Sequence, residues 1–228
     1  MSTKVKFTVL IAGFLVCLYF ILPKETVKDP SQKASFGAIK CTVAKFLLED
    51  IDTTQQISPL FENLGTLNFT ITTSNPRAQE FFNQGLRLTY AFNHAEAHRP
   101  FMEASRLDPG APMTYWGQAY ALGPNINDPL PLEERKIKYN EAMAKAMKWI
   151  SKATPMEQAL IEALTHRYST DLTTDVAELN MAYMKAMEKV LEQFPNDANV
   201  QTLYAASVMN TVPWNYWDKS GNPSANIA

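Results

Sequence analysis

The order of hydrophobic and polar residues divides this chain into three parts. An apolar run covers residues 7–22, follows Lys4 and Lys6, and ends at Pro23. A basic start before such a run is typical of an export signal. At about 1.5 Å per residue the run forms a helix of roughly 24 Å, slightly short of a ~30 Å hydrocarbon core. We predict that residues 1–23 are a signal anchor or a cleaved signal peptide, with the rest of the chain outside the cytoplasm.

A polar stretch, residues 24–35, follows with almost no apolar side chain, as is typical of a flexible tether. We expect residues 36–74 to pack on the region after them. The two cysteines fall in different parts. Cys17 lies in the apolar run and adds lipidation as a third alternative for the signal. Cys41 is either a packed apolar residue or a reactive or intermolecular thiol.

Residues 75–217 form the third part, in which apolar residues recur at spacings of three and four, the pattern of amphipathic helices. Asn75 before a proline starts a helix. Asn93 with Glu96, and Thr154 with Glu157, have the spacing of capping boxes. A long insertion, 123–132, interrupts the pattern. The predicted helices cover 75–92, 93–107, 113–122, 133–150, 154–168, 176–194 and 198–209.

Residues 78–111 carry small and large residues at fixed offsets within 34 positions. With Ala78 as position 1, the small and aromatic residues fall where a tetratricopeptide repeat packs its first helix on its second and on the next repeat. The segment resembles such a repeat. The predicted packing residues are Phe81, Gly85, Ala97, Phe101, Ala104 and Pro109.

The resemblance extends over residues 59–218. The runs Phe81-Phe-Asn-Gln-Gly-Leu, Phe92-Asn-His-Ala-Glu-Ala and Leu122-Gly-Pro-Asn-Ile-Asn resemble exported bacterial tetratricopeptide proteins of uncharacterised function. It implies an all-α solenoid of antiparallel helical hairpins. It also implies a location in the bacterial cell envelope, anchored in the inner membrane with the body in the periplasm, or secreted if the signal is cleaved.

The resemblance also bears on the end of the chain, because members of this group usually continue with further repeats. Residues 218–228 are rich in Gly, Asn, Pro and Ser, and we expect a flexible tail on an array that stops before its cap. An alternative is that a partner or a second copy covers this end. The aromatic cluster available to such an interface is Trp214, Tyr216 and Trp217.

The same resemblance implies a ligand groove on the inner face of the first helix. A protein or peptide is the implied ligand, and Phe82 stands where a carboxylate clamp has lysine, which favours a mixed apolar and polar peptide. In the alternative interpretation, Phe82 and Tyr90 pack against residues 36–72 instead. The implied groove residues are Gln79, Phe82, Asn83, Leu86, Thr89 and Tyr90.

Composition and charge exclude some classes of function. The chain of 228 residues is 46% hydrophobic with a formal charge of −2, which excludes a disordered chain and, lacking a basic excess, makes nucleic acid an unexpected partner. There is no glycine-rich phosphate loop and no Gly-x-Ser-x-Gly motif. The sequence therefore favours a binding scaffold over an enzyme, without a cofactor.

One pair of residues points to different chemistry. His94 and His98 are four apart, so a helix places both imidazoles on one face, where a divalent metal is able to bridge them. A third ligand has to come from Asp108, Glu103 or His166. The alternative is structural: His94 follows the predicted N-cap, and His98 lies on the hairpin surface. A metal-binding protein or metalloenzyme is thus the competing prediction, and a self-assembling subunit is a third.

Overall fold

The computed structural model describes residues 51–224 and residue 227. The predicted membrane segment, the predicted tether and Cys41 lie outside the described residues. Within them the chain forms helices and turns, with two isolated β-bridges and no strand, so the all-α class is confirmed for this part. The helices are α3 (Pro76–Tyr90), α4 (His94–Leu107), α5 (Pro112–Leu122), α6 (Glu133–Trp149), the short 3₁₀ helix η1 (Ile150–Lys152), α7 (Pro155–Thr165), α8 (Val176–Gln193) and α9 (Ala198–Thr211).

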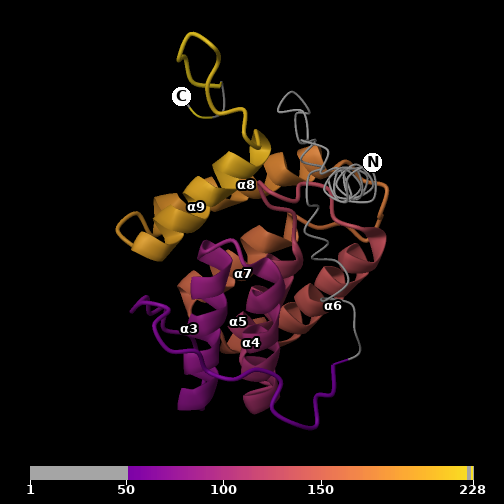
Figure 1. The fold of residues 1–228 in the computed structure, drawn as a ribbon, viewed down its shortest axis with the longest axis vertical. Helices are drawn as coiled ribbons and strands as arrows, with labels where there is room; N and C mark the ends of the chain where they lie inside the picture. The colour runs from indigo at the N-terminus through magenta and orange to yellow at the C-terminus, as the bar shows by residue number, and fades with distance from the viewer. Residues whose placement is uncertain (1–50, 225–226, 228) are drawn as a thin grey trace, which may run out of the picture. The chain divides into compact units, whose positions relative to one another are not determined.

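Consecutive helices pack on one another in chain order (Figure 1). α3 packs on α4, α4 on α5, α5 on α6, α7 on α8, and α8 on α9. Helices two apart also touch, since α3 contacts α5 and α5 contacts α7. These contacts are those of helical hairpins that follow one another along the chain. A helix with the length and apolarity needed to cross a bilayer is not found among the described residues.

Two helix starts form as the sequence predicts. The Asn75 side chain accepts a hydrogen bond from the Arg77 backbone N–H at 3.0 Å, and a proline occupies the first turn of α3. Thr154 and Glu157 form a reciprocal capping box at the start of α7, in which each side chain accepts from the other residue's backbone N–H. The caps fix where these two helices begin.

The capping box predicted at Asn93 is wrong, although α4 does begin immediately after it. Asn93 has φ −93° and ψ 61°, outside the extended region that an N-cap side chain needs, and its side chain makes no capping hydrogen bond. Phe92 before it has a positive φ of 59°, so the tight turn between α3 and α4 sets this geometry. The first turn of α4 is therefore left without a side-chain cap.

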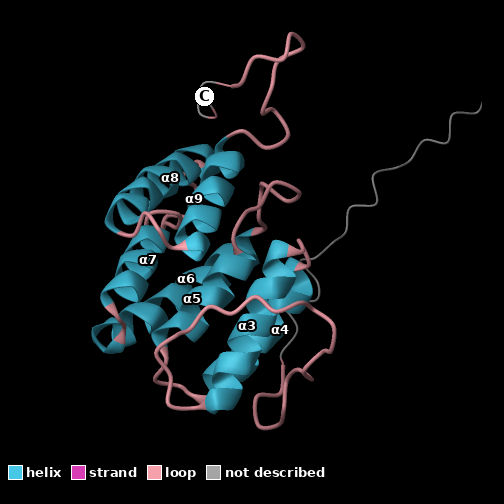
Figure 2. Ribbon diagram, turned by 90° about the vertical axis from the view of Figure 1, so that its left-hand side faces the viewer, coloured by secondary structure: helices cyan, strands magenta, loops and turns pink. Residues whose placement is uncertain are grey.

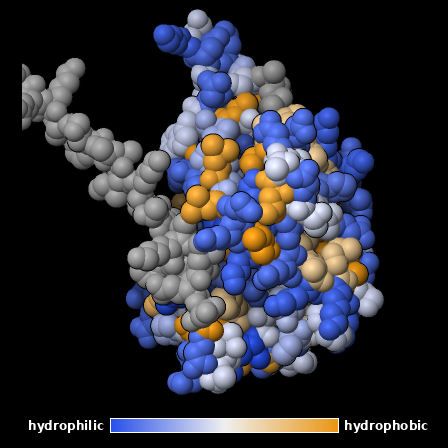
Figure 3. All heavy atoms as spheres, turned by 90° about the vertical axis from the view of Figure 1, so that its right-hand side faces the viewer, coloured by the Kyte–Doolittle hydropathy of each residue, from blue (hydrophilic) through white to orange (hydrophobic). Residues whose placement is uncertain are grey.

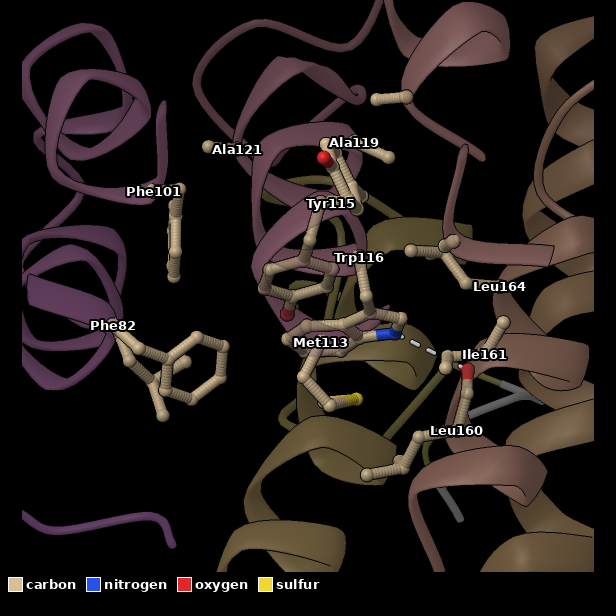
Figure 4. Packing of buried hydrophobic residues seen from close by; sticks show 14 of the residues in the cluster. Phe82, Phe101, Met113, Tyr115, Trp116, Ala119, Ala121, Leu160, Ile161 and Leu164 are labelled. Carbon is tan, nitrogen blue, oxygen red and sulfur yellow. Dashed lines mark hydrogen bonds between the residues drawn. The ribbon is translucent and has the colours of Figure 1, made fainter. Parts of the chain in front are cut away.

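The core is organised around Phe101 of α4, which is fully buried (Figure 4). A Cβ atom added at Gly85 of α3 would lie 2.8 Å from its ring, and one added at Gly117 of α5 would lie 2.3 Å from it. The rings of Phe101 and Phe82 meet edge to face, with centroids 5.4 Å apart. Two helix backbones thus approach one aromatic ring, which is possible only because both positions are glycine. Phe81, Ala97 and Ala104 are buried in the same core, and Pro109 is exposed.

A second part of the core joins α5 to α7. Trp116 is fully buried, and its indole N–H donates to the Leu160 carbonyl at 3.2 Å (Figure 4). The face on the α6 side is mainly hydrophilic where Figure 3 colours it, with apolar side chains in small separate groups. Scattered apolar groups of this kind are normal on a protein surface and do not by themselves indicate an interface.

Candidate functional site

The face of α3 that was predicted as a ligand groove is covered by the chain's own preceding segment. Figure 2 shows that segment running across α3. Residues 68–71 of this segment contact three of the predicted groove residues, Gln79, Phe82 and Asn83. Phe82, Asn83, Leu86 and Thr89 are buried, and Gln79 and Tyr90 are half-buried.

Side-chain amides of α3 hold this segment by its backbone. Asn83 accepts from the Phe69 backbone N–H at 3.0 Å. Gln79 accepts from the Ile71 N–H and donates to the Phe69 carbonyl, both at 2.8 Å. The rings of Phe69 and Phe82 pack edge to face with centroids 5.9 Å apart. The amides therefore bind an extended backbone here, with a phenylalanine seated beside them.

The expectation of an open groove on α3 is accordingly corrected. Its hydrogen-bonding groups are already paired with residues 57–72, so a peptide would have to displace this segment before it could bind. Phe82 packs against the segment, as the alternative interpretation had it. Tyr90 does not share these contacts, because it faces a pocket at the far end of α3.

That pocket lies where four distant parts of the chain meet. It has a volume of about 240 Å³ and is formed by the turn between α3 and α4, the first residues of the 123–132 insertion, Arg167 just after α7, and α9. Apolar side chains make up most of its wall. Its lining residues include Tyr90, Phe92, His94, Tyr120, Ile126, Arg167, Ala206 and Met209.

Three polar side chains converge on the pocket with hydrogen-bonding atoms that have no partner among the described residues. These atoms are the Tyr90 hydroxyl, both ring nitrogens of His94, and Nε of Arg167, and all are buried. Buried polar groups in proteins are nearly always hydrogen-bonded, and an unpaired one costs about 1–3 kcal/mol. Three such groups in one wall mark this pocket as the candidate site.

Arg167 is the most unusual of the three, because only 2% of it is exposed although it carries a charge. Its guanidinium lies over two aromatic rings, 5.0 Å from the Tyr183 centroid and 5.7 Å from the Tyr120 centroid. One Nη donates to the Pro124 carbonyl. No ion pair involving Arg167 is found among the described residues. The side chain is held in place by rings and a carbonyl, and its charge has no carboxylate partner.

The other charges near the pocket are compensated. Arg135, also buried, pairs with Asp128 and donates to the Leu122 carbonyl at 2.7 Å, which fixes the insertion against α6. Asp197 caps α9 by accepting from the Asn199 and Val200 N–H groups. Among the described residues that line the pocket, Arg167 is therefore the charged side chain without an ion pair.

The two neighbouring titratable groups are neutral at pH 7. Burial, and after it the charges of Arg167 and Arg135, lowers the pKa of His94 to about 4. Burial raises the pKa of Tyr90 far above its ordinary value, and nearby Tyr120 and Asp197 add to this. Because neither group ionises, the pocket offers a neutral imidazole, a phenol O–H donor and one guanidinium.

The histidine pair predicted as a metal site does not gather further ligands. No group of three or more His, Cys, Asp or Glu side chains able to hold a metal is found within residues 51–224 and 227. Glu103 pairs with Arg106 and accepts from the Ile57 N–H, and Asp108 accepts from Thr73 and Ser74. His98 is buried rather than on the hairpin surface. His166 lies elsewhere, in a groove between α7 and α8.

The C-terminal aromatic cluster is largely exposed. Trp214 is 71% exposed and Trp217 is 60% exposed, whereas Tyr216 is half-buried. Trp217 forms an isolated antiparallel bridge with Pro223, which folds the chain back after α9. An interface at this end stays a prediction.

Sequence reasoning missed Arg135 and Arg167, although both leave a signal. Arg167 continues the stripe of Leu160, Ala163 and Leu164 at helical spacing, and those three residues are buried. Arg135 begins the α6 stripe in the same manner. An arginine in line with an apolar stripe indicates a buried charge, and buried charges are rare enough to point to a site.

Comparisons with family models, with curated proteins and with solved structures gave no significant match. The fold therefore places the protein in the all-helical class. Its described part consists of successive helical hairpins with a small, mostly apolar pocket.

Proposed function

We propose that this protein is a binding module built as a tetratricopeptide-like array, and that its ligand enters the pocket formed by the α3–α4 turn, the insertion and α9. The proposal keeps the sequence prediction that the module binds a peptide or protein outside the cytoplasm, on a membrane anchor provided by residues 1–23. It moves the binding site from the face of α3 to the end of that helix.

The repeat architecture is supported by the packing of Phe101. In such arrays the second helix of one repeat packs between its own first helix and that of the next repeat. Phe101 of α4 contacts Gly85 of α3 and Gly117 of α5, which are the two helices in question. The chain order of helix contacts follows the same scheme.

The observation that carries the choice of site is the set of unpaired buried polar atoms in the pocket wall. The α3 face has its amides occupied by residues 57–72, whereas Tyr90, His94 and Arg167 have buried polar atoms without a partner among the described residues. A mostly apolar pocket with a few convergent polar groups is the usual form of a ligand site.

Screening a library of small neutral fragments by ¹H–¹⁵N NMR tests the site. We expect binding fragments to shift the amide signals of residues that line the pocket, such as Thr89, Ile126 and Thr202. Ala206→Leu places a larger side chain in the same wall and should abolish these shifts. Ala186→Leu, in the groove between α7 and α8, is the matched control and should preserve them. Shifts that persist in Ala206→Leu would place the binding site elsewhere.

A further inference from the structure

This pocket differs from an ordinary apolar pocket in one respect: its wall contains the buried guanidinium of Arg167. An isolated buried charge is costly, and proteins normally pair it with an opposite charge. Here two tyrosine rings and one carbonyl hold the guanidinium, and Nε has no partner among the described residues. A ligand with a negative charge would supply the missing partner.

The polar groups beside Arg167 suit the same kind of ligand. The Tyr90 hydroxyl is a buried donor without an acceptor. The first turn of α4, which begins at His94 in the pocket wall, has no side-chain cap, and the N-terminus of a helix favours negative charge. Arg167 and the helix N-terminus thus add positive potential to one small cavity, the Tyr90 hydroxyl adds a donor, and Asp197 is the negative group near Tyr90.

The number of charges narrows the ligand further. Among the described residues that line the pocket, Arg167 is the one charged side chain, and none of the ion pairs found in residues 51–224 includes it. A carboxylate carries one negative charge and matches this balance, whereas a phosphate dianion would leave one charge buried and unpaired. The geometry of a guanidinium also fits a carboxylate well.

The other lining residues indicate the chemical nature and size of the rest of the ligand. Phe92, Ile126 and Met209 are apolar and line the cavity. The volume of about 240 Å³ is below the ~300–1,000 Å³ of pockets for drug-sized molecules. The ligand is therefore small, with an apolar body next to its charged group.

We propose, on the basis of the function proposed above, that the pocket binds a small monocarboxylate with an apolar body, whose carboxylate pairs with Arg167 and accepts from the Tyr90 hydroxyl. Two sources offer this chemistry, a free organic acid and the C-terminal residue of a peptide. Both present one carboxylate beside an aliphatic or aromatic group.

Isothermal titration calorimetry at pH 7 tests the proposal with defined probes. Hexanoate represents the free acid, and an acetylated tripeptide ending in leucine with a free carboxylate represents the peptide source. Hexanamide is the uncharged counterpart of hexanoate, and inorganic phosphate is the anion without an apolar body. We expect one molecule of hexanoate or tripeptide per chain, the tighter of the two identifying the source, with hexanamide and phosphate at least about tenfold weaker because charged hydrogen bonds are lost or unmatched.

Tyr90→Phe is the decisive variant, since replacement of Arg167 also removes its contact with Pro124 and so tests folding as well as binding. The Tyr90 hydroxyl has no partner among the described residues, so its removal should leave the melting temperature unchanged or raise it. We expect the variant to bind hexanoate about tenfold more weakly than the unmodified chain. It should lose less affinity for hexanamide, because the neutral carbonyl accepts a weaker hydrogen bond than a carboxylate does. Tyr204→Phe removes a hydroxyl outside the pocket lining and is the matched control.

Three results would overturn the proposal. These are equal affinity for hexanoate and hexanamide, phosphate binding as tight as hexanoate binding, or unchanged hexanoate affinity in Tyr90→Phe. If hexanamide binds as tightly as hexanoate and Ala206→Leu abolishes that binding, the pocket remains the ligand site. Only the preference for a carboxylate is then refuted. Failure of every probe to bind, together with fragment shifts unaffected by Ala206→Leu, would refute both.

Discussion

The contact of Phe101 with two glycines makes a quantitative prediction for Gly117→Ala. The new Cβ would lie 2.3 Å from Cδ1 and 2.4 Å from Cε1 of the Phe101 ring, whereas carbon atoms pack at about 3.5–4.0 Å. The ring has little freedom to withdraw, because Gly85 and the Phe82 ring also contact it. Overpacking of this kind costs about 1–3 kcal/mol, and here we expect the upper part of that range.

A helical propensity term acts in the opposite direction. Replacing glycine by alanine inside a helix stabilises it by about 1 kcal/mol when the side chain has space. The expected net loss for Gly117→Ala is therefore about 2 kcal/mol of unfolding free energy, measured by urea denaturation and far-UV circular dichroism. Ala144→Gly, at an exposed position within α6, calibrates the propensity term and should cost about 1 kcal/mol.

A double-mutant cycle separates the clash from other effects of the substitution. Phe101→Ala removes Cγ, Cδ1 and Cε1, the atoms that meet the new Cβ. Gly117→Ala should therefore cost less in the Phe101→Ala background than it costs in the unmodified chain. We expect a coupling of at least about 1 kcal/mol, within the range known for residues in contact. A Gly117→Ala variant that is as stable as the unmodified chain, or more stable, would refute the argument that α4 and α5 pack through this ring.

Two further predictions concern buried ionisable groups. Burial lowers the pKa of His98 to about 4 from 6.5, so the unfolded chain binds a proton first and stability falls as the pH drops from 6.5 toward 4, by about 3 kcal/mol. In urea titrations at several pH values, His98→Leu should remove much of this dependence, and His94 contributes in the same direction. Glu157 is buried and accepts three hydrogen bonds from Thr72 and Thr154, so Glu157→Gln should lower the unfolding free energy by about 2 kcal/mol, whereas the exposed Glu162→Gln should change it little. Equal stability of these two variants in urea would contradict the assigned role of Glu157.

The helices were predictable because their signals are local. Spacings of three and four, a proline after Asn75 and the Thr154–Glu157 pair all act within one or two turns. The Asn93 cap failed for an equally local reason that the sequence conceals: Asn93 follows Phe92 with its positive φ, has a ψ of 61°, and makes no capping hydrogen bond. Residue identity specifies which side chain is able to cap, and only the turn conformation decides whether it does so.

The α3 face shows a different limit of sequence reasoning. An asparagine and a glutamine one turn apart are suited to hold an extended backbone, and the sequence indicates that capacity at Asn83 and Gln79. It does not indicate whether the backbone belongs to a ligand or to the same chain. Residues 57–72 are covalently attached, so they bind at a high effective concentration and a separate peptide competes at a disadvantage. The capacity was predictable, whereas the occupant required the three-dimensional path of the chain.

The pocket was harder to predict than the helices or the α3 face, because its lining residues come from several separate segments of the chain. Its walls come from residues near 90, 124, 167 and 206, and the insertion after α5 supplies the part near 124. Arg135 holds that path at Leu122 and Asp128, and Arg167 holds it at Pro124. The two arginines thus determine where the insertion lies, and one of them keeps an unpaired nitrogen. Buried donors are normally paired, and Nε of Arg167 has no partner among the described residues, which supports the proposed binding role in addition to support of the loop.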